Sequence, residues 1–181
     1  MPRYAAFLRG INLGNRRVKN EQLQDCFVGL GFGEVDTFRA SGNVIFSADE
    51  PKTIEDLSRR IEDGLADGLG FQVTTFLRSA EQMNQIASYK PFADETVASS
   101  AGKLQVMLLA TQPPARARTQ VLELASEEDL LAIHGSELYW LPNGRITDST
   151  LDLKTIAKAL GDCTQRTKGT IEQIAAKHFA V

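Results

Sequence analysis

The residues best suited to chemistry are concentrated in one short stretch, from Arg9 to Lys19, which follows an apolar run. The stretch contains four cations, two glycines and two asparagines, and a helical pattern comes after it. A strand, a glycine-containing loop and a helix often form a phosphate site, because the first amides of a helix are unpaired and carry partial positive charge. The sequence therefore predicts a site for a small anion. Its candidate binding residues are Arg9, Asn12, Arg16, Arg17 and Lys19.

No motif in this stretch identifies a particular nucleotide. A P-loop requires Gly-x4-Gly-Lys-Ser/Thr, whereas Gly10 and Gly14 are separated by three residues and Asn15 follows them. The dinucleotide pattern Gly-x-Gly-x-x-Gly is also absent. The predicted ligand is therefore a nucleotide or another phosphorylated metabolite, with no reaction or cofactor specified. In the alternative interpretation, the glycines form turns and the arginines are only solvated.

A second motif, RASGN at residues 39–43, separates two strand patterns. It is typical of a hairpin turn, because glycine and asparagine tolerate positive φ. We expect this turn at the end of the sheet opposite to the end of the first strand, so that only the long loop after that strand, folding back, could bring the turn to Arg9. Ser41 and Asn43 are more often turn formers than ligands.

Two further polar loops, at residues 141–151 and 164–170, each precede a predicted helix and contain a cation. Arg145 and Arg166 are therefore possible contributors to the anion site, if the loops converge. The alternative is that polar side chains in these loops only cap the helices that follow. The candidate caps are Asp148, Ser149 and Thr170.

The other reactive residue types do not form a recognisable catalytic set. His134, beside a hairpin glycine, and His178, on the final helix, have no paired carboxylate or cysteine near them, so a histidine-based triad or a metal site is not expected. Cys26 falls on a predicted apolar helix face, and Cys163 has no adjacent histidine. Two cysteines this far apart predict neither a disulfide framework nor a metal cluster.

The elements that must position these loops follow from the apolar periodicity. Residues 1–78 have the order β-α-β-β-α-β, the ferredoxin-like unit. Its predicted strands are 4–8, 35–39, 44–47 and 71–77, and its helices are 20–30, with Asn20 as N-cap, and 51–69.

Residues 79–181 resemble a shortened copy of the first half. A helix at 79–89, with a capping box made by Ser79 and Gln82, is followed by a loop at 90–102. Strands at 104–109, 130–134 and 137–141, a helix after Pro114 and two C-terminal helices, 152–160 and one from Thr170, complete it. The predicted fold is α+β, with two ferredoxin-like halves that contain antiparallel sheets, plus C-terminal helices.

Composition limits the class of protein. The chain has 181 residues, 43% of them hydrophobic and 24% charged, as in ordinary globular proteins. There is no apolar run of the roughly 20 residues that cross a bilayer and no signal-peptide pattern, so we expect a cytoplasmic protein. The formal net charge of −3 disfavours a dedicated nucleic-acid binder.

Four stretches resemble a widespread bacterial family that is known only as a domain of unknown function, number sixteen-ninety-seven. They are FLRGINLG at 7–14, LGF at 30–32, ASGNVIFS at 40–47 and LPNG at 141–144. The resemblance implies two α+β halves and supplies no activity. The family pattern has Ser-Lys-Leu after the last of these motifs and Thr-Arg-Asn-Trp near the end. In this chain Thr150 replaces the lysine, and Arg166 is retained without the Asn-Trp pair.

The leading hypothesis is a protein that binds a small anion through the Arg9–Lys19 loop, either as a binding protein or as an enzyme. A nucleic-acid-binding module is the first alternative, since ferredoxin-like sheets can carry RNA, but the aromatic pattern of such sheets is missing. A protein–protein adaptor without catalysis is the second. The oligomeric state does not follow from the sequence.

Overall fold

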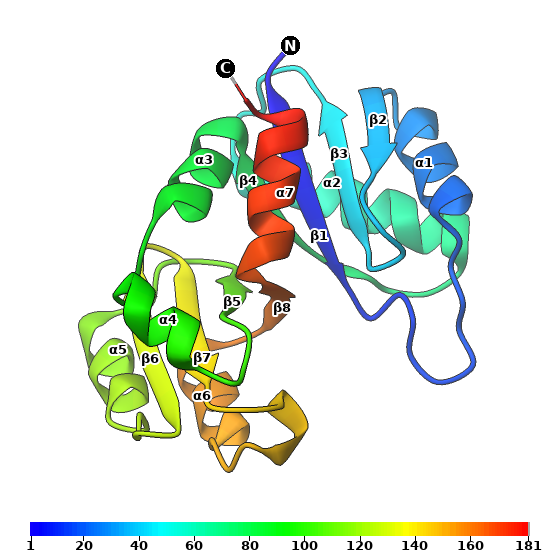
Figure 1. Cartoon of the computed structure of the whole chain (residues 1–181). Helices are drawn as coiled ribbons and strands as arrows, with labels where there is room; N and C mark the ends of the chain where they lie inside the picture. The colour runs from blue at the N-terminus through cyan, green and yellow to red at the C-terminus, as the bar shows by residue number, and fades with distance from the viewer. Residues whose placement is uncertain (181) are drawn as a thin grey trace. The chain divides into compact units, whose positions relative to one another are not determined.

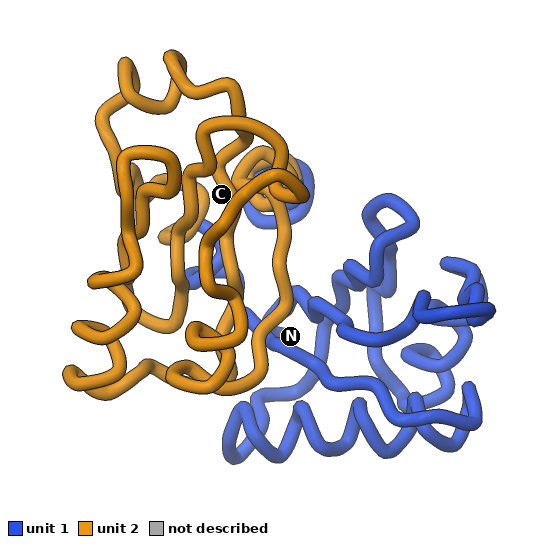
Figure 2. The backbone as a smooth tube through the Cα atoms, turned by 90° about the horizontal axis from the view of Figure 1, so that it is seen from below, with its two compact units in different colours: residues 1–84, 174–181 blue, residues 85–173 orange. Residues whose placement is uncertain are grey.

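The computed structural model describes residues 1–180 and divides them into two compact units (Figure 2). Unit 1 contains residues 1–84 and 174–181, and unit 2 contains residues 85–173. Each unit has a four-stranded antiparallel sheet and the β-α-β-β-α-β order. The prediction of an α+β fold with two similar halves is therefore confirmed. The predicted boundary at residues 78/79 stays a prediction.

Unit 1 is built on a sheet with the strand order β2-β3-β1-β4. Helices α1 and α2 cover one face of this sheet (Figure 1). Its elements are β1 (Arg3–Arg9), α1 (Asn20–Gly29), β2 (Gly33–Thr37), β3 (Asn43–Ser47), α2 (Ile54–Leu69), β4 (Thr74–Ser79) and α3 (Ala80–Ser88), which continues into unit 2.

The core of unit 1 forms where apolar side chains of alternate strand positions meet the apolar stripe of α2. On β1, Tyr4, Ala6 and Leu8 belong to this core, as do Ile61 and Leu65 of α2. The alternation follows from the two-residue period of a strand, and the spacing of four from the helical period. These two patterns, which are visible in the sequence, fix which faces meet.

Two predicted helix starts in unit 1 are displaced. Helix α2 begins after Thr53, whose hydroxyl accepts from the Asp56 amide at 3.0 Å, rather than at Pro51. Helix α1 has Lys19 as N-cap, one residue before the expected Asn20. The capping box of α3 is present as predicted, with bonds of 2.9 and 3.2 Å between Ser79 and Gln82.

The expected position of the β2–β3 turn is wrong. β1 and β3 are antiparallel, with Phe7 opposite Asn43, so the start of β3 lies beside the end of β1. The Leu8 amide donates to the Gly42 carbonyl at 2.8 Å. The turn at residues 39–42 therefore lies at the same end of the sheet as Arg9. Antiparallel pairing alone requires this arrangement.

Gly42 is the residue of this turn that lies closest against the residues around the end of β1. Its φ is +70°, and a Cβ there would lie 2.8 Å from Ile11 Cδ1 and 3.2 Å from the Leu8 carbonyl oxygen. We expect Gly42→Ala to lower the free energy of unfolding by about 2 kcal/mol, because the positive φ and the contacts both oppose a side chain. Urea denaturation measures the loss.

Gly70 provides the matched control for Gly42. It has a φ of +81°, but a Cβ there would have no neighbour within 4 Å. Gly70→Ala should therefore cost only the conformational part, about 1 kcal/mol. Equal losses in the two variants would show that the contacts with Ile11 and Leu8 contribute nothing.

Unit 2 repeats the topology with the strand order β6-β7-β5-β8. Val121 of α5 and Ile156 of α6 pack with Met107, Leu138 and Trp140 of the sheet in one apolar cluster. Its elements are α4 (Asp94–Ser99), β5 (Gln105–Leu109), α5 (Ala115–Leu122), β6 (Asp129–His134), β7 (Glu137–Pro142), the 3-10 turn η1 (Ile146–Asp148), α6 (Leu153–Leu160), β8 (Cys163–Thr167) and α7 (Lys168–His178), which ends in unit 1.

Two regions predicted as loops in unit 2 are regular structure. Residues 163–167 form β8, which pairs along β5 from Leu109 to Gln105. Helix α4 lies within the predicted loop 90–102 and has no buried residue, so it carries no apolar stripe that the sequence could reveal. Among the described residues, no helix combines the length and the apolar character that crossing a membrane requires.

Candidate functional site

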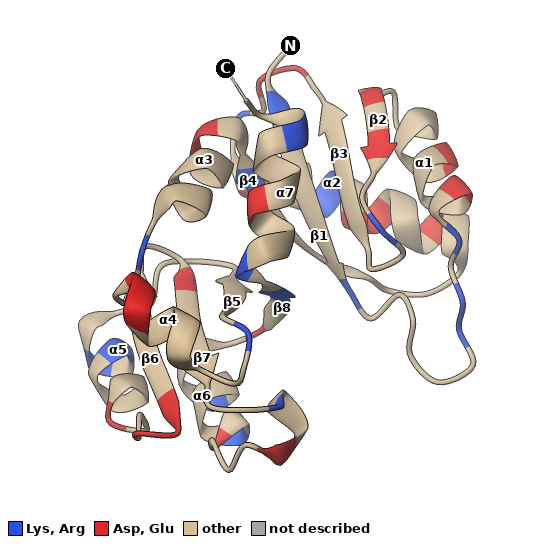
Figure 3. Cartoon of the chain, viewed as in Figure 1, with Lys and Arg blue, Asp and Glu red and all other residues tan. Residues whose placement is uncertain are grey.

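Unit 1 contains a cavity of about 620 Å³ at the N-terminus of α1. Figure 3 shows Lys and Arg positions along the segment that leads into this helix. The cavity joins the loop after β1 to the β2–β3 turn, which the antiparallel pairing brings to the same end of the sheet. Its lining residues are Asn12, Arg17, Val18, Lys19, Asn20, Glu21 and Ala40.

The loop that forms most of this lining is held by its own hydrogen bonds. Asn12 Oδ1 accepts from the Val18 amide at 3.1 Å. Arg17 Nη1 donates to the carbonyls of Gly14, at 3.3 Å, and Arg16, at 2.8 Å. The Ile11 side chain, 4% exposed, anchors the start of the loop in the core. These contacts fix the position of the Arg17 guanidinium at the cavity wall.

The start of α1 adds unpaired backbone donors to this cavity. The Lys19 amide donates to Gln22 Oε1 at 2.9 Å. The amides of Asn20 and Glu21 have no hydrogen-bond partner among residues 1–180. A lysine N-cap has no acceptor atom to satisfy them. The positive end of this 10-residue helix therefore faces the same space as the two cations.

Three of the predicted site residues, Asn12, Arg17 and Lys19, line the cavity. Arg16 does not, because its guanidinium lies over the Phe71 ring, 4.2 Å from the centroid. Arg9 is exposed at the end of β1 and is also outside the lining. Four lining residues were not predicted from the sequence: Val18, Asn20, Glu21 and Ala40. The RASGN motif at residues 39–43 was the available signal for Ala40, but the turn was expected at the wrong end of the sheet.

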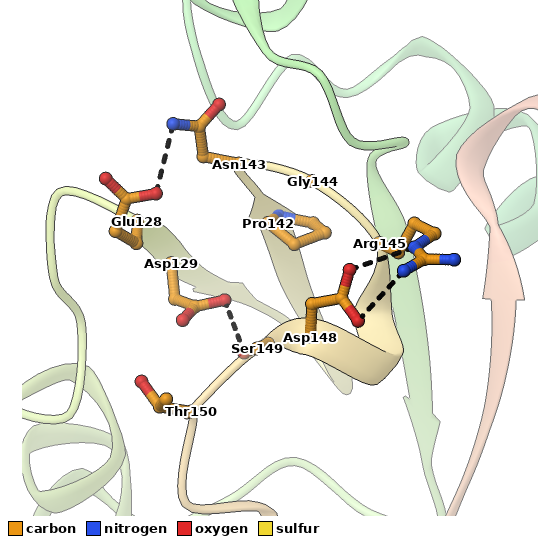
Figure 4. Close-up of a pocket in the computed structure, with 9 residues that line it drawn as sticks. All are labelled: Glu128, Asp129, Pro142, Asn143, Gly144, Arg145, Asp148, Ser149 and Thr150. Carbon is orange, nitrogen blue, oxygen red and sulfur yellow. Dashed lines mark hydrogen bonds and ion pairs between the residues drawn. The ribbon is translucent and has the colours of Figure 1, made fainter.

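The two candidate arginines of unit 2 have different surroundings. Arg145 Nε forms an ion pair with Asp148 at 2.9 Å and lines a smaller pocket of about 220 Å³ (Figure 4). Arg166 lies on β8 rather than in a loop, and Nη1 donates to Thr164 Oγ1 and to the Gln165 carbonyl, both at 2.8 Å. Burial lowers the pKa of Arg166 to about 10.

The expected caps in the polar loops of unit 2 are also displaced. Asp152 caps α6 by accepting from the Thr155 amide at 3.0 Å. Ser149 instead donates to Asp129 Oδ1 at 2.8 Å. Helix α7 begins before Thr170, whose amide donates to the hydroxyl of Thr167 at 3.2 Å.

The two histidines have different surroundings. His134 stacks on Tyr89, with ring centroids 4.2 Å apart. Asp36 is far from His178 in the sequence, but its Oδ2 lies 3.7 Å from His178 Nε2 and also binds Lys177. Burial and Lys177 lower the pKa of His178, although Asp36 opposes them. No group of three or more His, Cys, Asp or Glu residues within the described part of the chain is arranged to hold a metal ion.

Comparisons with known proteins place the chain in a family. A similar solved structure is that of the conserved bacterial protein SP0830 from Streptococcus pneumoniae, with a TM-score of 0.76, 20% identity and 97% of each chain covered. At this identity the likeness concerns the fold alone. None of the curated proteins matches the sequence. The family model described as "Protein of unknown function (DUF1697)" matches residues 1–139, and the chain therefore belongs to this family.

Proposed function

We propose that this protein binds a small anionic ligand, of the class of a nucleotide or another phosphorylated metabolite, in the unit 1 cavity. One observation carries the proposal: Arg17, Lys19 and the unpaired amides of Asn20 and Glu21 meet around one space. Such amides and cations are the donors that phosphate groups use at helix N-termini. The volume of about 620 Å³ lies in the range of small-molecule sites.

The cavity lining restricts the charge that a ligand can carry. Arg17 and Lys19 provide two positive charges, and Glu21 provides one negative charge. A guanidinium or ammonium contact to phosphate contributes roughly 1.5–3 kcal/mol. Two such contacts contribute roughly 3–6 kcal/mol. Micromolar affinity corresponds to about 8 kcal/mol net of the entropic cost of binding, so the helix amides and the rest of the ligand must supply the remainder.

The direct test is a thermal-shift series with inorganic phosphate, AMP and ATP at constant ionic strength, with NaCl as the reference. A ligand at 100 times its Kd stabilises the folded state by about 2.7 kcal/mol. For a chain of this size that corresponds to a rise in Tm of about 5–10 °C. If no phosphorylated compound raises Tm above the NaCl reference, the proposal fails.

Glu21 yields a test in which affinity and stability change in opposite directions. We expect Glu21→Gln to strengthen phosphate or nucleotide binding about threefold to tenfold, since removal of a nearby like charge gains about 1 kcal/mol. The same change should lower the stability of the unliganded protein by about 0.3–1 kcal/mol, because an acid in the first turn of α1 interacts favourably with the helix dipole. Titration calorimetry and urea denaturation measure the two effects.

Glu55 is the matched control for Glu21, since it lies in the first turn of α2 and does not line the cavity. Glu55→Gln should have a similar cost in stability and leave the affinity unchanged. An unchanged affinity in Glu21→Gln as well would place the ligand elsewhere.

A nucleic-acid partner would give a different result in the same protein. Binding to single-stranded RNA whose affinity falls steeply with salt, without a response to free nucleotides, would replace the small-ligand proposal by the nucleic-acid alternative. Absence of both responses leaves the adaptor alternative.

A further inference from the structure

The pocket of about 220 Å³ in unit 2 contains a buried carboxylate that is only half satisfied. Asp129, at the start of β6, is 3% exposed. Its Oδ1 accepts from Trp140 Nε1 at 2.7 Å and from Ser149 Oγ at 2.8 Å. Its Oδ2 accepts no hydrogen bond from residues 1–180 and is not among the fully buried polar atoms, so this oxygen is open to the pocket. An otherwise buried carboxylate that presents one oxygen to a pocket can accept a hydrogen bond from a ligand there.

The position of this carboxylate is fixed by its neighbours. Trp140 is fully buried in the core of unit 2, so its indole N–H is a rigid donor. Ser149 is itself held, because its Oγ also accepts from the Leu151 amide at 3.0 Å. Figure 4 shows the second oxygen of Asp129 on the side of Thr150, at the wall of the pocket. The Thr150 hydroxyl lies in the same lining and can accept a further hydrogen bond.

The charges that line the pocket favour a cation. Three carboxylates and one guanidinium line it. Arg145 is engaged by Asp148 at 2.9 Å, and Glu128 accepts from Asn143 Nδ2 at 3.1 Å. Glu128 is exposed, whereas Asp129 is a buried carboxylate without a cationic partner, and its second oxygen accepts no hydrogen bond from the described residues. No described trio of His, Cys, Asp or Glu has the arrangement of a metal site.

We infer that this pocket binds a small organic cation with a primary ammonium group, which donates to Asp129 Oδ2 and to the Thr150 hydroxyl. An ammonium has three N–H donors and one positive charge, which match a carboxylate oxygen and neighbouring hydroxyl acceptors. The volume equals that of roughly seven water molecules at about 30 Å³ each. The pocket therefore suits an amine of a few heavy atoms. This site is separate from the anion cavity of unit 1 and does not depend on it.

Calorimetric titration with n-propylammonium tests the inference, with tetramethylammonium at the same ionic strength as the control. Tetramethylammonium has the same charge but no N–H donor. We expect propylammonium to bind at least tenfold more tightly than tetramethylammonium. Equal affinities for the two cations would overturn the inference. The absence of any heat of binding from propylammonium at concentrations up to about 50 mM would overturn it as well.

Asp129→Asn removes the charge while Oδ1 of the amide can still accept from Trp140 and Ser149. We expect it to weaken propylammonium binding at least tenfold. Glu123→Gln, an exposed position at the end of α5 outside the pocket, is the matched control and should leave the affinity unchanged. Unchanged binding in Asp129→Asn contradicts the inference.

Thr150→Arg keeps the test decisive even where Asp129→Asn does not fold. Thr150 is exposed, so the longer side chain is compatible with the fold, and its guanidinium would occupy the space next to Asp129. We expect this variant to lose propylammonium binding while the thermal response to phosphate stays the same. Full binding in Thr150→Arg would show that the amine does not occupy this pocket.

Discussion

Replacing Arg17 and Lys19 together with alanine is expected to weaken phosphate or nucleotide binding at least 100-fold. Both residues line the cavity at the N-terminus of α1. Each charge-assisted contact contributes roughly 1.5–3 kcal/mol, and a loss of 2.8 kcal/mol already corresponds to about 100-fold. Titration calorimetry with the tightest ligand from the thermal-shift series measures the change.

The control for this double variant must remove the same charge without reaching the cavity. Lys52 and Arg116 are exposed, and neither lines the cavity. The Lys52→Ala, Arg116→Ala variant should keep its affinity within about twofold, since the long-range effect of exposed charges is screened at physiological salt. If both double variants lose affinity equally, the binding reflects net charge and the cavity is not the site.

The single Arg17→Ala variant is also informative when it loses less affinity than the double variant. Arg17 Nη1 also donates to two carbonyls of its own loop, so this residue both shapes the loop and lines the cavity. Lys19 has no such role, since its amide rather than its side chain binds Gln22. A loss of affinity in the single Lys19→Ala variant therefore reports a direct contact between the lysine side chain and the ligand.

The parts of the fold that could be predicted from the sequence are those with a periodic apolar face. Helix α2 shows this clearly, because Leu57, Ile61 and Leu65 are spaced for one buried stripe and all three are buried. Strands β1 and β5 are short apolar runs between polar loops, which is typical of central strands.

Strand β8 could not be predicted in the same way. Its sequence, CTQRT, has no apolar alternation, and the residues pair with β5 through the backbone. The fully buried β5 needs hydrogen-bond partners on both sides, and β7 supplies only one of them. The topology of the sheet determines which segment pairs with the other side of β5, and a local sequence pattern carries no information about that topology.

The candidate sites differ in how much the sequence revealed of them. For the anion cavity, cations and glycines concentrated in one loop were a visible signal, and Asn12, Arg17 and Lys19 were among the predicted residues. For the unit 2 pocket, only Arg145 was predicted. Asp129 looked like an ordinary surface acid beside Glu127 and Glu128, because nothing local indicates that Trp140, on the neighbouring strand, binds it.

Truncation of Phe46 is expected to lower the stability of unit 1 without changing the residues that line its cavity. Phe46 on β3 is fully buried, and its ring centroid lies 5.7, 5.2 and 4.8 Å from those of Tyr4, Phe27 and Phe32. Phe46→Ala should cost about 3–5 kcal/mol, from lost apolar burial and a residual cavity. That loss lowers Tm by about 10 °C, which a thermal scan detects.

The comparison with Phe46→Leu shows whether packing is the cause. Leucine keeps most of the volume, so the loss should stay below about 1.5 kcal/mol. A large loss in Phe46→Leu would instead assign the stability to contacts between the aromatic rings, which are worth only about 0.5–1.5 kcal/mol per pair beyond burial. Because Phe46 does not line the anion cavity, folded Phe46→Leu should bind phosphate as the unmodified protein does. The Arg17→Ala, Lys19→Ala variant is expected to keep its Tm and lose ligand binding, whereas a Phe46 variant is expected to have a lower Tm and keep ligand binding. Together, these two results would locate the function at the loop before α1 rather than in the fold as a whole.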